Sequence, residues 1–182
     1  MKKNIIILAL ILIASALTAC ANAIIADNDE ETSEEIVVIQ ADYPFYESAK
    51  DIVNSADLIF AGKITDQKYE YLDVKSEKGK DPETGLEKAS AIPYTIFEIQ
   101  VSKMYFGSTD DKTIYIKCPG GKIDDKTYIS EMTKNLKPEI EYLFLAKSFK
   151  NTYPSLINDT QSFYDLNDKD NTELNEILKI IG

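Results

Sequence analysis

Cys20 is the residue whose surroundings point most directly to chemistry. It follows Leu17, Thr18 and Ala19 at the end of a short apolar run, and two lysines stand before that run. The first 19 residues therefore have the positive, apolar and small-residue segments of an export signal in the right order. This order predicts that residues 1–19 are removed and that the thiol of Cys20 lies at the new N-terminus, open to modification.

The segment Leu17-Thr18-Ala19-Cys20 resembles the lipobox of bacterial lipoproteins. In that family the cysteine sulfur carries a diacylglycerol, whose two acyl chains, such as palmitate, anchor the protein stably, because one acyl chain alone binds a membrane only marginally. The resemblance implies a protein held by lipid at Cys20 on the extracytoplasmic face of the cell membrane. Two other interpretations stay open. They are a retained membrane helix, which needs roughly 20 apolar residues, and an ordinary secretory signal cut near Ala21-Asn22-Ala23.

The charge of the chain argues against nucleic acid as a partner. The 182 residues include 20 lysines and 31 acidic residues, for a net charge of -11, and removal of Lys2 and Lys3 leaves the mature chain still more acidic. Such a surface repels phosphate backbones and anionic headgroups. The heavy use of Lys, Ile and Asn without any Arg fits an AT-rich genome and a Gram-positive host.

Missing residue types restrict the catalytic chemistry. The chain has no His, Arg or Trp, so Ser-His-Asp and Cys-His systems cannot be assembled and zinc loses its commonest nitrogen ligand. Neither a glycine-rich phosphate loop nor a CxxC pair occurs. We therefore expect no catalytic, cofactor or metal site, and a hydrolase that uses carboxylates or a Ser–Lys pair is the enzymatic alternative.

Cys118 is the second cysteine, and it has no partner for a disulfide if Cys20 carries lipid. A reactive thiol needs a nearby cation or base to lower its pKa, and Lys117 and Lys122 are the local candidates. Because Cys118 ends an alternating run just before Pro119, the sequence favours a small packed residue at the end of a strand.

The remaining sequence divides into a tether and one domain. Residues 20–35 include Asp27–Glu35, a stretch with six acids and no base that self-repels and stays extended. Residues 36–182 form a single β-rich domain. Within it, Pro44 predicts the first turn of a helix whose apolar stripe runs from Phe45 to Ala56. Near the C-terminus, Leu174, Ile177 and neighbours at helical spacing predict a second helix with Thr172 as its N-cap.

Strand signals fill the region between these helices. Gly62 interrupts the first run, where a bulge or sharp bend is expected. The predicted strands are 58–72, 95–102, 114–118, 126–132, 142–146 and 162–166, and the charged, glycine-containing segment 75–90 is a predicted loop. This pattern predicts a mainly β domain with two flanking helices, built as a small OB-like β-barrel, with an open β-sandwich as the alternative.

Four segments resemble the OB-like barrels of the netrin/TIMP-type module and of bacterial surface proteins with a similar pattern. They are Ser55–Thr65, the glycine-ended strand Tyr94–Gly107, the strand Ile114–Gly121 that runs into Pro-Gly-Gly, and Tyr142–Leu145. The resemblance implies a barrel over Ser55 to Leu166. It does not carry protease inhibition, because the animal inhibitors use a free cysteine amine braced by disulfides, whereas Cys20 would be acylated and Cys118 unpaired.

Three tyrosines are candidates for a ligand surface. Tyr69 and Tyr71 share a strand face, and Tyr94 lies near the start of the next predicted strand. OB-type barrels hold oligosaccharides on such strands and the adjoining loops, although tyrosines are also strong β-formers that simply cover barrel surface. We expect a lipid-anchored, non-catalytic binding or interaction module whose partner is a cell-wall glycan or an envelope protein.

Overall fold

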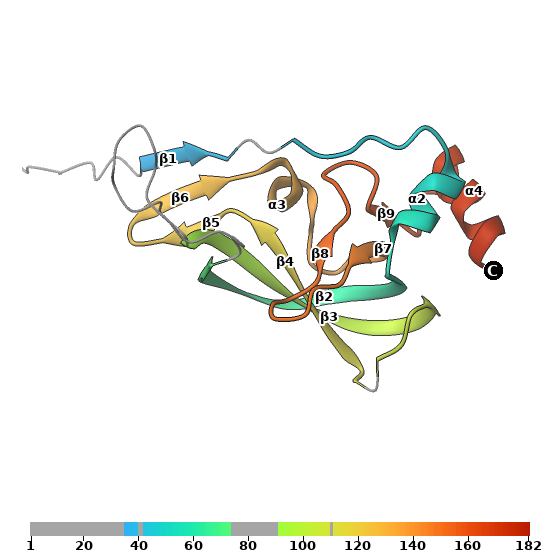
Figure 1. The fold of residues 1–182 in the computed structure, drawn as a ribbon, viewed down its shortest axis with the longest axis horizontal. Coiled ribbons are helices and arrows are strands. Elements are labelled where there is room, and N and C mark those ends of the chain that lie inside the picture. Colours follow the sequence, from blue (N-terminus) through green and yellow to red (C-terminus); the bar gives the residue numbers. More distant parts are fainter. Residues whose placement is uncertain (1–34, 40–41, 74–90, 110) are drawn as a thin grey trace, which may run out of the picture. The chain divides into compact units, whose positions relative to one another are not determined.

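The computed structural model describes residues 35–39, 42–73, 91–109 and 111–182. Its strands are drawn in Figure 1, and five of them close into a barrel. The strands are β1 (Glu35–Val38), β2 (Leu58–Asp73), β3 (Ala91–Phe106), β4 (Thr113–Pro119), β5 (Gly121–Ile123), β6 (Lys126–Ile129), β7 (Glu141–Lys147), β8 (Ser155–Leu156) and β9 (Phe163–Asp165), and the helices are α2 (Ala49–Ser55), α3 (Glu131–Asn135) and α4 (Thr172–Ile181). The predicted export signal, Cys20, the tether up to residue 34 and the predicted loop 75–90 lie outside the described residues.

The barrel closes because β2 pairs on both of its edges. The pairs run β2–β3, β3–β4, β4–β8, β8–β7 and then β7 back to β2. Counted along the chain, the five barrel strands follow the order 1-2-3-5-4. This closed barrel confirms the predicted mainly β fold and is consistent with an OB-like architecture, whereas the open sandwich is ruled out by the β2–β7 pairing.

Gly62 allows β2 to bend around the barrel. The register of β2 against β3 shifts between Ala61 and Gly62, which confirms the predicted bulge. A Cβ atom at Gly62 would lie 2.6 Å from the carbonyl oxygen of Gln100 on β3. Any other residue there would push the two strands apart, so the close approach requires glycine.

The barrel wall is apolar on both sides along β7, which explains its continuous apolar sequence. Tyr142, Phe144 and Ala146 point into the barrel and join a core that includes Phe60, Phe97 and Ile116. Their neighbours Leu143 and Leu145 point outward and pack under α2 and α4. Successive strand residues face opposite sides, so one strand serves two cores.

The two flanking helices form, but the first one begins later than the sequence predicts. Ser48 is its N-cap and accepts a hydrogen bond from the backbone N–H of Asp51, so Pro44 precedes the helix and Phe45 is exposed. The segment before Ser48 is extended because buried side-chain amides bind its backbone. The Gln161 amide accepts a hydrogen bond from the backbone N–H of Tyr46 and donates one to the Tyr46 carbonyl, both at 3.0 Å, and Asn158 donates to the carbonyl of Pro44. In α4 the cap is Asn171 rather than Thr172.

The predicted strand 126–132 is also corrected. It ends at Ile129, because Ser130 caps the short helix α3 and forms a reciprocal capping box with Thr133. Gly120, with φ +103, turns the chain sharply between β4 and β5. The strands β1, β6 and β5 then form a small separate sheet in which β1 runs parallel to β6. Among the described helices, none has the length and apolar character needed to cross a membrane.

Candidate functional site

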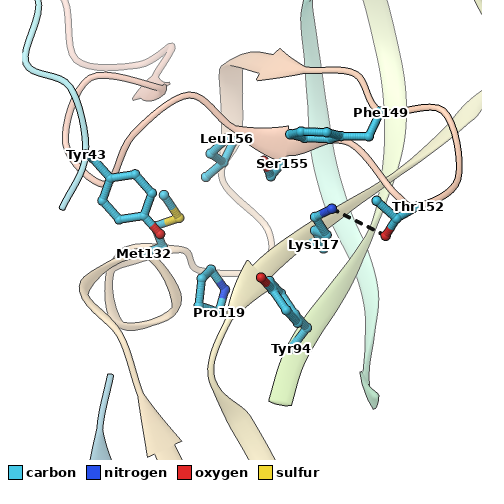
Figure 2. A pocket seen from close by; sticks show the side chains of 9 residues that line it. All are labelled: Tyr43, Tyr94, Lys117, Pro119, Met132, Phe149, Thr152, Ser155 and Leu156. Carbon is cyan, nitrogen blue, oxygen red and sulfur yellow. Dashed lines mark hydrogen bonds between the residues drawn. The ribbon is translucent and has the colours of Figure 1, made fainter. Parts of the chain in front are cut away.

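The pairing between β4 and β8 is the shortest in the barrel, and a pocket lies beside it. These two strands run parallel and share one residue pair, Lys117 with Ser155. Beyond that pair the strands separate, and side chains from five parts of the chain surround a cavity of about 280 Å³ (Figure 2). The lining residues are Tyr43, Tyr94, Lys117, Pro119, Met132, Phe149, Thr152, Ser155 and Leu156.

Lys117 brings a buried positive charge to this pocket. On β4 the side chains of Ile116 and Cys118 point into the barrel, so the alternation turns Lys117 to the outer face. It is nevertheless only 5% exposed. Burial lowers the pKa of the Lys117 ammonium below its usual value, because a charged group loses favourable hydration away from water.

The β7–β8 loop (148–154) covers Lys117. Its Thr152 Oγ1 lies 3.3 Å from Lys117 Nζ, and the ring of Phe149 lies 4.3 Å from the same nitrogen. The loop is fastened to the strand, since the backbone N–H of Lys117 donates to the carbonyl of Pro154 at 2.9 Å. Tyr153 adds a ring contact with Tyr115 on β4. The loop therefore holds an aromatic ring and a hydroxyl against the ammonium.

Two tyrosines form the remaining walls, Tyr43 at the left and Tyr94 at the bottom of Figure 2. Tyr94 projects from β3, with its ring centroid 6.0 Å from Lys117 Nζ, and Tyr43 faces the pocket from the extended segment before α2. Burial raises the pKa of Tyr43 to about 12, with smaller contributions from Cys118 and Tyr94. Within the described residues, neither phenol has a hydrogen-bond partner. Both hydroxyls are therefore available to a ligand.

An adjoining cavity of about 430 Å³ has a different charge. It shares Tyr43, Pro119 and Met132 with the first pocket, and it is also lined by the acidic side chains of Asp42, Glu131 and Asp159. The positive charge of Lys117 and these carboxylates thus lie in neighbouring cavities that meet at Tyr43.

The structure separates the three tyrosines that the sequence singles out. Tyr69 and Tyr71 are 41% and 45% exposed on one face of β2. Tyr94 pairs across the strands with Glu70, so it points to the opposite face and is buried in the pocket. Tyr69 instead covers Gly121, and a hydrogen bond with Tyr128 is the main reason that the pKa of Tyr71 is raised to about 12.

Cys118 follows Lys117 in β4, and its side chain points to the opposite face of the strand. Its thiol is fully buried in the barrel interior, and this burial raises the pKa of Cys118 well above its usual value. Lys117 therefore does not activate it. In the described part of the chain, no three His, Cys, Asp or Glu side chains gather closely enough to hold a metal ion.

Sequence reasoning missed Lys117, Tyr43 and Phe149 as pocket residues. The available signal was Lys117 itself, a charged residue in the middle of an apolar strand run, but nothing in the sequence shows that the 148–154 loop folds over it. Comparisons with protein-family models and with curated proteins find no match for this chain.

Proposed function

We propose that this protein is a lipid-anchored, extracytoplasmic binding module, non-catalytic, with the pocket around Lys117 as its ligand site. The observation that carries the proposal is a buried cation facing an apolar, aromatic-lined cavity without a carboxylate partner among the described residues. Protein pockets of this kind, mostly apolar with a few placed polar groups, are typical of small-molecule sites. The cavity also lies against strands β3 and β4 and the β7–β8 loop, which correspond to the surface that OB-type barrels use for ligands.

The anchor at Cys20 is the first part of the proposal to test. Labelled palmitate should enter the wild-type protein in bacterial cells, and Cys20→Ala should lose both the label and membrane retention. Persistent labelling of Cys20→Ala would contradict the anchor.

The pocket is tested with a variant that fills it. Thr152→Trp places a large ring against Lys117, and Asn151→Trp adds the same ring to the neighbouring exposed position as a matched control. Both full-length proteins are isolated from intact cells, and defined wall fragments or envelope proteins that co-purify are quantified. Material bound to wild type and Asn151→Trp but lost from Thr152→Trp supports the proposal. Equal recovery from all three proteins contradicts it.

One observation favours a second candidate, a hydrolase that uses a hydroxyl–lysine pair. Lys117 Nζ lies 3.3 Å from Thr152 Oγ1, and Ser155 lines the same pocket. A lysine that acts as a base must first lose its proton. Burial, which lowers the pKa of Lys117, makes this loss easier, whereas the faces of Phe149 and Tyr94 favour the ammonium form. The two effects oppose each other, so the hydrolase has to be tested directly.

A hydroxyl-directed fluorophosphonate probe separates the two candidates. A hydrolase should be labelled covalently, and Thr152→Val or Ser155→Ala should lose the label. Absence of labelling at full probe excess would leave the binding module as the better account.

A further inference from the structure

We infer that the pocket takes a small organic anion whose carboxylate pairs with the ammonium of Lys117 and whose apolar body lies against Tyr94, Phe149 and Tyr43. This inference rests on the proposed function and names the class of ligand. Each part of it comes from a separate feature of the pocket: the unpaired charge, the free hydrogen-bond donors, and the size and composition of the walls.

Lys117 combines burial with an unpaired charge, whereas the lysines that pair with carboxylates are exposed. Lys68, Lys126 and Lys147 each contact a carboxylate at 2.5 to 2.9 Å, and their side chains are 43–52% exposed. Lys117 is far more buried, yet within the described residues it contacts no carboxylate. A buried charge without a counter-ion is costly, so an anion that enters the pocket would supply the missing partner.

The donors around the pocket suit an acceptor-only group. An ammonium has three N–H donors, and Thr152 Oγ1 accepts one of them. Two remain for a ligand, together with the hydroxyls of Tyr43 and Tyr94. An ionised carboxylate has two oxygens and accepts several such bonds.

The walls and the volume define the rest of the ligand. Aromatic rings and the side chains of Pro119, Met132 and Leu156 supply a mostly carbon surface. A volume of about 280 Å³ corresponds to roughly nine water volumes of about 30 Å³ each. This volume has room for a compact molecule on the scale of benzoate. The carbon walls disfavour inorganic phosphate, which has no apolar body.

The test uses three probes of nearly the same shape on the full chain: benzoate, the neutral benzamide and the cationic benzylamine, with inorganic phosphate as a fourth arm. Affinities are measured by NMR titration. Benzoate should bind at least about tenfold more tightly than benzamide, because charge-assisted hydrogen bonds are the stronger ones. Lys117→Met should remove this preference, so that benzoate binds no more tightly than benzamide, whereas Lys117→Arg should retain it.

Lys103→Met is the matched control. Lys103 also lies over an aromatic ring, 4.1 Å from the centroid of Tyr105, but it does not line the pocket, so the preference for benzoate should survive its loss. If Lys117→Met fails to fold, the wild-type ratio and Lys117→Arg still decide the question.

Several outcomes overturn the inference. They are equal affinity for benzoate and benzamide, tighter binding of benzylamine, phosphate binding as tight as benzoate, or no binding of any probe. The proposed function is judged separately by Thr152→Trp. Loss of co-purified material from that variant, together with equal affinity for benzoate and benzamide, would leave a binding module whose ligand is not recognised by charge.

Discussion

Two parts of the barrel wall are covered differently: helices bury one completely, whereas a loop over the other leaves a cavity. Over β7, the helices α2 and α4 bring Ile52 and Ile177 onto Leu145, and all three side chains are fully buried. Over β4, the β7–β8 loop brings Phe149 above Lys117 and leaves a cavity of about 280 Å³. Helices present a continuous apolar stripe every three to four residues and can seal a sheet. A seven-residue loop has no such stripe, so it covers the strand incompletely and leaves space for a ligand.

The largest expected effect lies on the helix-covered side. Ile177→Ala should lower the free energy of unfolding by about 2–5 kcal/mol, because it opens a cavity in a closed apolar layer. Ile180→Ala, on the exposed face of the same helix, should change it by less than about 0.5 kcal/mol. Urea denaturation of both variants measures the difference. A similar small effect at both positions would mean that α4 does not seal the wall.

The barrel interior behind Lys117 should show an intermediate effect. Cys118→Ser places a hydroxyl in a fully buried apolar site and should cost about 1–3 kcal/mol, with a smaller loss for Cys118→Ala. In the Cys20→Ala protein, where Cys118 is the one remaining thiol, a thiol reagent should react slowly until urea unfolds the chain. Rapid reaction of the native protein would show that the pocket opens into the barrel interior.

The hydrogen bonds at the start of the β7–β8 loop should contribute less to the free energy of unfolding than either buried side chain. Asp57 accepts hydrogen bonds from Lys147 Nζ at 2.9 Å and from the backbone N–H of Ser148 at 3.0 Å, and these bonds lower the pKa of Asp57. Because the pair is exposed, Asp57→Asn should cost less than about 1 kcal/mol at pH 7.

The pH dependence of this loss follows from the direction of the shift. The stabilisation is fully present above the unfolded pKa of Asp, about 3.9, and it disappears as the pH falls through the lower folded pKa. The difference between wild type and Asp57→Asn should therefore vanish in strong acid when thermal unfolding is followed against pH. A difference that persists there would assign the loss to packing rather than charge.

The smallest expected change in stability is at the pocket itself. Lys117→Met removes a buried charge that has no carboxylate partner in the described chain, and it keeps the length of the side chain. The free energy of unfolding should stay within about 1 kcal/mol of wild type or rise, because replacing buried charge with apolar volume is often neutral or stabilising. Chemical denaturation checks this. A loss of several kcal/mol would show that Lys117 supports the fold rather than a ligand.

The strand pattern could be predicted because it depends on neighbours in the chain. The bulge at Gly62 and the two-sided burial of 142–146 follow from a glycine in an alternating run and from an unbroken apolar run. The late start of α2 could not be predicted, because Asn158 and Gln161, more than 100 residues away, hold the segment around Pro44 extended. The sequence also could not show that Tyr94 faces away from Tyr69 and Tyr71, because its register with Glu70 is a property of the paired strands.

The sequence by itself determined the long strands and the two flanking helices, the acidic charge, the absence of histidine and arginine chemistry, and Cys20 as the candidate for lipid. These follow from composition and from patterns a few residues long. Only the tertiary structure decided that the barrel closes, that Cys118 and Lys117 face opposite sides of one strand wall, and that a loop from elsewhere in the chain covers the lysine. A buried charge and a pocket exist only once distant segments exclude water together, and no local pattern records which segments those are.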